Sequence, residues 1–156
     1  MNAEFFMMRA IELARLGMSR GDGGPFGAVV VRDGEVIGEG WNRVLASNDP
    51  TAHGEVTAIR DACERIGSFD LAGCDIHTTG EPCPMCLGAV YWARIKTIHY
   101  GFSIEDAAAI GFDDREFHRQ FQLPREGRMV PVVQVCRDAA LQLAADYAAM
   151  PGRRAY

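Results

Sequence analysis

Two short stretches, far apart in the sequence, constrain this chain most, because their side chains make chemical sense only together. They are Thr51-Ala52-His53-Gly54-Glu55-Val56 and Glu81-Pro82-Cys83-Pro84-Met85-Cys86. Cys83 and Cys86 are three residues apart, so they share one face in the first turn of a helix. His53 and Glu55 are two apart and would diverge on a regular helix, so we expect His53 at the very start of its helix. The fold must therefore bring two helix starts together.

One His and two Cys are ligands that zinc prefers, and they fill three of its four tetrahedral positions. An open fourth position distinguishes a catalytic zinc from a structural one. Water in that position loses a proton near neutral pH and becomes a nucleophile. Glu55 is not needed as a ligand and is suited to carry protons from this water to a substrate ring nitrogen and a leaving amine. Because H-x-E with P-C-x-x-C is typical of zinc-dependent nucleobase deaminases, the pattern predicts hydrolytic deamination.

Other interpretations use the same cysteines. Alone, the Cys83–Cys86 pair also fits a thioredoxin-like redox motif, which the upstream His53 disfavours. A closed structural zinc site needs a fourth ligand, for which Cys74, His77 and His99 are the candidates, but structural sites usually combine two closely spaced ligand pairs. A non-catalytic zinc or redox module is thus the alternative outside enzyme chemistry.

Length and composition indicate a single globular domain over residues 1–156. The chain is long enough to bury a proper core, and its 48% hydrophobic and 24% charged residues are ordinary values. No apolar stretch is long enough for a membrane span, and no basic region precedes an apolar run at the N-terminus, so we expect a cytoplasmic protein without a membrane partner. The net charge of -5 disfavours a nucleic-acid partner, because phosphate binding depends on a basic surface.

The cysteines outside the motif are Cys63, Cys74 and Cys136. Each lies among apolar residues, so we expect reduced, buried packing residues in a reducing compartment. No disulfide framework is expected.

Hydrophobic periodicity predicts an α/β fold. Helical spacing is expected over 3–19, 53–66, 83–94, parts of 104–121, and 139–150, and strands over 28–31, 35–37, 75–79, 95–100 and 129–135. Asp33-Gly34 predicts a hairpin turn between the first two strands. A hairpin followed by alternating helices and strands predicts a three-layer α/β/α architecture, with one mixed five-stranded sheet covered by helices on both faces.

Several further motifs accompany the zinc motifs. They are Gly23-Gly24-Pro25-Phe26-Gly27-Ala28-Val29, Ser47-Asn48-Asp49-Pro50, Tyr91-Trp92-Ala93-Arg94, Gly111-Phe112-Asp113-Asp114 and the terminal Tyr156. With them, the sequence closely resembles the guanine deaminases of the cytidine-deaminase-like superfamily over nearly its whole length. The zinc motifs belong to the whole superfamily, whereas Phe-Asp-Asp and the terminal Tyr favour this branch.

The resemblance implies roles for residues outside the zinc motifs. Asn42 resembles the side chain that hydrogen-bonds the base, for which an amide offers both a donor and an acceptor. Phe26 and Trp92 resemble the aromatic faces that hold the ring. Asp114 resembles the acidic residue near the substrate amine, a possible second proton carrier, and Tyr156 resembles the residue that closes the pocket.

The resemblance also implies an assembly and a reaction. In the family the C-terminal segment, here about 130–156, crosses to the partner of a homodimer, and each chain carries one zinc ion. The implied reaction converts the purine base guanine to xanthine and ammonia, in purine salvage or catabolism.

Alternatives within the same chemistry stay open. Gly54 stands where these enzymes usually have Ala, as it does in fungal cytosine deaminases, and Thr79-Gly80 also departs from the family pattern. Cytosine, guanosine and an aminotriazine such as ammeline are therefore alternative substrates. A tRNA adenosine deaminase, which flips its target base into a similar pocket, is disfavoured by the acidic net charge.

Overall fold

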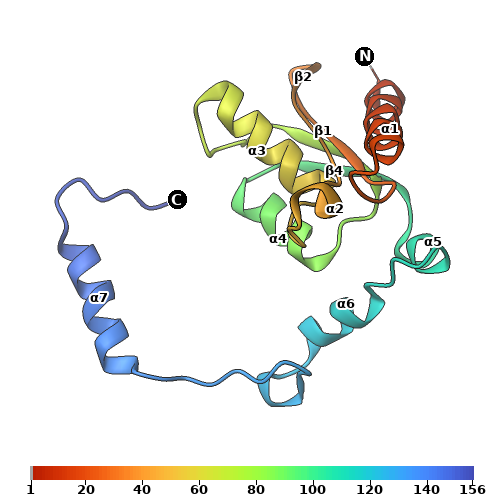
Figure 1. Cartoon of the computed structure of the whole chain (residues 1–156). Helices are drawn as coiled ribbons and strands as arrows, with labels where there is room; N and C mark the ends of the chain where they lie inside the picture. The colour runs from red at the N-terminus through yellow and green to blue at the C-terminus, as the bar shows by residue number, and fades with distance from the viewer. Residues whose placement is uncertain (1) are drawn as a thin grey trace. The chain divides into compact units, whose positions relative to one another are not determined.

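The computed structural model describes residues 2–156, which form the following elements in order (Figure 1): α1 (Ala3–Arg20), β1 (Gly27–Arg32), β2 (Glu35–Trp41), α2 (Val44–Ser47), α3 (Gly54–Ile66), β3 (Asp75–Gly80), α4 (Pro84–Trp92), β4 (Thr97–Phe102), α5 (Ile104–Ala109), α6 (Arg115–Gln122), the short 3-10 helix η1 (Arg125–Gly127) and α7 (Arg137–Ala149). None of the described helices is both long enough and apolar enough to cross a bilayer. The predicted α/β class is confirmed.

The strands form one mixed sheet in the order β2-β1-β3-β4. β1 pairs antiparallel with both β2 and β3, and β3 pairs parallel with β4. The predicted hairpin turn is present, with both Asp33 (φ 51°) and Gly34 (φ 81°) in the left-handed region, as a two-residue hairpin that follows strand twist requires.

Helices cover both faces of this sheet because side chains alternate along β1 (Figure 1). Val29 and Val31 pack against Phe6 and Leu13 of α1. On the opposite face Ala28 and Val30 join the larger core cluster, in which the buried partners from the rest of the sheet and from α3 and α4 include Ala58, Ala62, Ile76 and Val90. The three-layer arrangement is therefore confirmed.

The sheet has four strands in the described residues, so the prediction of five is wrong. The missing strand is 129–135, which has no regular structure and is exposed throughout. Its four valines have strand propensity, but a strand needs a neighbour to satisfy its backbone hydrogen bonds, and pairing is not a property of one segment's sequence.

The chain divides into two units, one ending at His118 and the other covering Arg119–Tyr156. The second unit contains α7, which the periodicity predicted, and no residue of α7 is buried in the single chain. Cys136 precedes this helix and is exposed, so its predicted burial is wrong, whereas Cys74 is buried and Cys63 half-buried.

Parallel pairing of β3 and β4 places their carboxyl ends at one edge of the sheet, where Gly80 is the register partner of Phe102. β3 then leads directly into the cysteine motif, with Cys83 immediately before α4. Sites in α/β proteins commonly lie beyond the carboxyl ends of strands. This edge holds the predicted ligands.

A pair of histidines lies within the sheet away from that edge. The rings of His77 and His99 stack at 4.3 Å between centroids, and Phe6 lies against His77 at 5.2 Å. His77 is only 2% exposed, and no described residue hydrogen-bonds its Nδ1. Burial, aided by the charge that His99 would carry, lowers the pKa of His77 from 6.5 to about 4.

This burial predicts an acid-sensitive contribution to stability. Because the folded-state pKa lies below the unfolded value, the unfolded chain binds more protons between about pH 6.5 and pH 4. The contribution is complete above pH 6.5 and declines as pH falls, by at most about 1.4 kcal/mol per pH unit. We expect His77→Phe, measured by urea unfolding at pH 7 and pH 5, to show a decline smaller by roughly 1–2 kcal/mol than the wild type. Equal declines would contradict a neutral buried His77.

Candidate active site

His53 and Cys83 hold equivalent places at the starts of neighbouring helices. His53 is the extended N-cap residue of α3, and Cys83 is the extended N-cap residue of α4, with Pro84 in its first turn. Proline at a first helical position has the right φ and lacks only a hydrogen bond that the helix start could not make. Both residues thus lie at a helix start, as the spacing predicts, and Cys86 follows in the first turn of α4.

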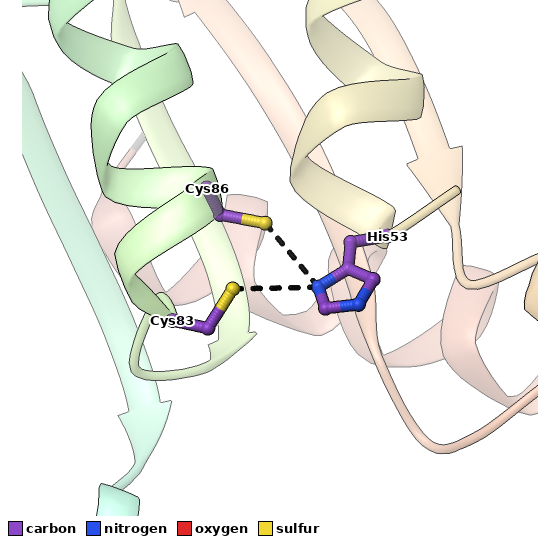
Figure 2. Close-up of side chains that lie close together, drawn as sticks. All are labelled: His53, Cys83 and Cys86. Atoms are coloured by element: carbon purple, nitrogen blue, oxygen red, sulfur yellow. Dashed lines mark hydrogen bonds between the residues drawn. The ribbon is translucent and has the colours of Figure 1, made fainter. Parts of the chain in front are cut away.

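The three predicted ligands meet at one point. His53 Nδ1 lies 3.5 Å from Cys83 Sγ and 3.4 Å from Cys86 Sγ, and Figure 2 shows both sulfurs directed at this nitrogen from the start of α4. All three donor atoms lie within 4.8 Å of one another. One imidazole and two thiolates in this arrangement fit a tetrahedral zinc ion and leave one position for a non-protein ligand.

The alternative fourth ligands do not join this cluster in the described part of the chain. Cys74 is buried and accepts a hydrogen bond from Arg32 Nε at 3.3 Å, while His77 and His99 stack on each other. The donor set is that of an open site rather than a closed structural one.

The electrostatic environment favours a thiolate at Cys83. Hydrogen bonding from Cys86 and from His53 lowers the pKa of Cys83 to about 4, and the helix start stabilises negative charge there. The same contact with Cys83, together with burial, raises the pKa of Cys86. Metal binding would displace the remaining thiol proton from Cys86.

Glu55 lies beside the ligands without being one of them. It is 6% exposed, and its Oε2 accepts a hydrogen bond from Cys86 Sγ at 3.4 Å. Burial raises the pKa of Glu55, and the Cys83 charge adds to this effect. A carboxyl group with a raised pKa can both take up and release a proton near neutral pH.

A cavity of about 440 Å³ opens at this point, entirely within the unit that ends at His118. His53, Glu55 and Cys83 line one part of it. The rest of the lining is mostly apolar or aromatic and includes Phe26, Leu45, Pro50, Phe112 and Phe117. A volume of this size suits a small molecule, and an apolar wall with a few polar groups is usual for such sites.

The predicted base-binding residues Asn42 and Phe26 both line this cavity. Asn42 is 6% exposed, its backbone N–H donates to the Phe26 carbonyl at 2.8 Å, and its Oδ1 accepts from Val44 N–H at 3.1 Å. These bonds fix the amide and link it to the loop carrying the aromatic ring.

Asp114 also lines the cavity, and its Oδ2 lies 3.2 Å from His118 Nε2 across one turn of α6. Asp114 is close enough to His53 to raise the pKa of that imidazole, after the larger effect of the Cys83 hydrogen bond. The contact with His118 therefore holds a carboxylate in the cavity lining.

The other two predicted aromatic residues, Trp92 and Tyr156, are both exposed in the single chain. Trp92, at the end of α4, is 71% exposed and does not line the cavity. Tyr156 belongs to the unit Arg119–Tyr156 and is exposed in the single chain.

Comparisons with known proteins identify the family to which this chain belongs. Residues 1–102 match the family described as the cytidine and deoxycytidylate deaminase zinc-binding region. The guanine deaminase of Bacillus subtilis is 53% identical over 135 residues, which is 86% of this chain and 86% of that protein. The chain belongs to the zinc-dependent deaminase family.

Solved structures of the deaminase family agree with this assignment. The crystal structure of guanine deaminase from Bacillus subtilis superposes with a TM-score of 0.95 at 47% identity, covering 100% of this chain and 99% of that one. A guanine deaminase from Nitrosomonas europaea has a TM-score of 0.66 at 32% identity, covering 93% of this chain and 84% of that one.

A tRNA-specific adenosine deaminase of Agrobacterium fabrum is a further relative by sequence. It is 47% identical over 96 residues, which is 62% of each chain.

Sequence reasoning missed several residues of this deaminase site. Glu81 lines the cavity and its Oε2 accepts from Ile104 N–H at 3.2 Å, which ties the cysteine loop to the start of α5. The spacing of Asp114 and His118 is a visible i, i+4 pair that indicates contact on a helix. No pattern in the sequence indicated that Phe112 or Phe117 would reach the cavity.

Proposed function

We propose that this chain deaminates guanine, releasing xanthine and ammonia. The observation that carries the proposal is the extent of the likeness to the Bacillus subtilis guanine deaminase structure, which covers the whole chain at a TM-score of 0.95. The match to the Agrobacterium tRNA-specific adenosine deaminase covers 62% of the chain. The likeness to guanine deaminase thus extends beyond the shared zinc-binding region at residues 1–102.

The cavity residues divide the work of the reaction. Phe26 and Phe112 supply aromatic faces for a planar base, and the fixed amide of Asn42 supplies hydrogen bonds that orient its edge. The apolar lining excludes bulk water, which strengthens these polar contacts. The base is thereby presented to the ligand cluster with its amine-bearing carbon inward.

Proton transfer falls to the two carboxyl groups. When bound by His53, Cys83 and Cys86, zinc supplies the Lewis acidity that makes water nucleophilic at neutral pH. Glu55 accepts a proton from the attacking water and donates it to the ring nitrogen next to the reacting carbon. We assign to Asp114, which is paired with His118, the transfer of the second water proton from the newly added hydroxyl to the departing amine. One water is consumed, the C–N bond breaks, and ammonia leaves.

This division of roles predicts the effect of one substitution. Glu55→Gln keeps the shape of the buried side chain and removes the proton carrier, so we expect ammonia release from guanine to fall by at least about 100-fold while zinc binding persists. The matched control is Glu64→Gln, an exposed carboxylate on the same helix, which should behave as wild type. The assay measures ammonia from guanine beside guanosine, cytosine, adenine and ammeline. Preference for another base, or activity that survives Glu55→Gln, would contradict the proposal.

We also propose that the chain forms a homodimer in which the two chains exchange their C-terminal segments. Exposed apolar side chains support this: Val130, Val132, Val133, Val135, Leu141, Leu143 and Tyr147 in the second unit, and Tyr91 and Trp92 on α4. Exposed apolar surface on this scale marks an interaction site. β4 is an edge strand with one unpaired side, and 129–135 is a segment of strand-forming residues that lacks a partner.

In this arrangement the segment from about 130 to 156 lies on the partner subunit, with 129–135 added to a sheet edge. Trp92 and Tyr156 then complete a cavity across the dimer.

Five free cysteines, two of them proposed ligands, suit a reducing compartment and support a cytoplasmic location.

Exchange predicts complementation between two inactive chains. A chain ending at Ala155 lacks the closing tyrosine, and Glu55→Gln lacks the proton carrier. In an exchanged heterodimer the shortened chain's own Glu55 is combined with the intact tail of its partner, so one of two sites works. We expect co-expressed, doubly tagged heterodimers to recover about half of the wild-type activity per dimer. Heterodimers no more active than either parent would indicate that each tail serves its own chain.

A further inference from the structure

The aromatic ring of Phe26 is held between two other rings. Phe102 lies 5.6 Å away and Phe112 lies 5.0 Å away, centroid to centroid, both edge-to-face. Phe26 and Phe112 line the cavity, whereas Phe102, at the end of β4, lies behind them. Because edge-to-face rings fix each other's orientation, a displacement of Phe102 is passed on to the cavity wall.

Gly80 provides the space for this arrangement. A Cβ atom at Gly80 would lie 2.5 Å from Cε2 and 2.9 Å from Cζ of Phe102, and 3.2 Å from Cε1 of Phe26. Even one methyl group would therefore displace both rings.

The backbone does not require glycine at this position. Gly80 lies at the end of β3 in register with Phe102, and it is absent from the glycines that have positive φ. An alanine would fit the strand geometry without strain, so the lack of a side chain at Gly80 matters only for the space that it leaves.

Gly24 bounds the same ring from its other side. A Cβ there would lie 2.8 Å from Cζ of Phe112 and 3.0 Å from Cε2 of Phe26. The Phe26 ring is thus confined on both sides, by Gly80 and Phe102 on one side and by Gly24 and Phe112 on the other.

We propose that Gly80 and Phe102 are specificity-determining positions that set the position of the Phe26 wall and thereby the width of the cavity beside it, without touching the substrate themselves. The inference rests on the proposed function in that the cavity is taken to hold a planar purine base. A larger residue at position 80 leaves the Phe26 ring in place only if the residue at position 102 becomes smaller. The two positions should therefore be energetically coupled, because both act on the same ring.

The first test compares two glycine substitutions. Gly80→Ala displaces Phe102 and Phe26 from their positions beside the cavity, so we expect KM for guanine to rise about tenfold with kcat changed less than about threefold. Gly88→Ala is the matched control: it lies on α4 near Cys86, no atom outside its chain neighbours and the backbone of its own helix lies within 4 Å of the added methyl, and KM should be unchanged. Zinc content, measured for every variant, should stay at one per chain.

The second test is rescue. Phe102→Leu removes the ring atoms that the new methyl meets, so Gly80→Ala with Phe102→Leu should return KM to within about threefold of wild type. The single variant Phe102→Leu leaves room beside Phe26 and should raise KM only modestly. Affinity for the product xanthine, measured by calorimetry, should follow the same order as KM.

Three results would overturn the inference: loss of zinc in Gly80→Ala, a fall in kcat with KM unchanged, or a double variant as poor as Gly80→Ala alone. Failure of the proposed function is distinguishable, because the wild type would then leave guanine unchanged. If another base is deaminated instead, the wild type, Gly80→Ala, Phe102→Leu and the double variant test the coupling on that base.

Discussion

The candidate site depends on one requirement: one imidazole nitrogen and two sulfur atoms must meet at a single point. Neither of the two helix starts holds this site alone, since His53 caps α3 and the cysteines begin α4. The parallel pair β3 and β4 and the core shared by α3 and α4 fix the two starts relative to each other. The cavity, Glu55 and the aromatic wall are arranged around that point.

The surroundings of the site also explain why a buried carboxyl group, Glu55, is tolerated beside the ligands. A carboxyl group with the burial of Glu55 would destabilise the fold if it were charged and alone. Because its pKa is raised, Glu55 keeps its proton to a higher pH than an exposed carboxyl group does, and the Cys86 thiol donates a hydrogen bond to it. The property that limits the cost of burial is also the property that lets this group exchange a proton during a reaction.

Most of the first unit was predictable from the sequence, because the signals were local. Ligand spacing, the Asp33-Gly34 turn and the periodicity of α1, α3 and α4 each depend on neighbouring residues. The five-strand prediction failed at 129–135, where strand propensity is present and a pairing partner is not. The burial of Cys136 failed for the same reason, because its apolar neighbours indicate packing without indicating what they pack against.

The cavity wall was predictable only in part. Asn42 and Phe26 came from a family resemblance, and no periodicity would have placed them beside Glu55. Gly80 stood out only as a departure from the family pattern, and nothing indicated its contact with Phe102, because that contact joins paired strands whose register the sequence does not specify. The roles proposed for Trp92 and Tyr156 involve a second chain, and contacts between chains are not specified by the local patterns of one sequence.

The central claim is an open zinc site with three protein ligands beside a proton-carrying carboxyl group. X-ray absorption spectroscopy of the zinc-loaded protein tests this most directly, because sulfur lies at about 2.3 Å from zinc and nitrogen or oxygen at about 2.0–2.2 Å. The account predicts two sulfur and two lighter ligands, with the lighter shell altered when a base binds. A shell of three or more sulfur ligands, or one that stays the same with saturating base, would contradict it.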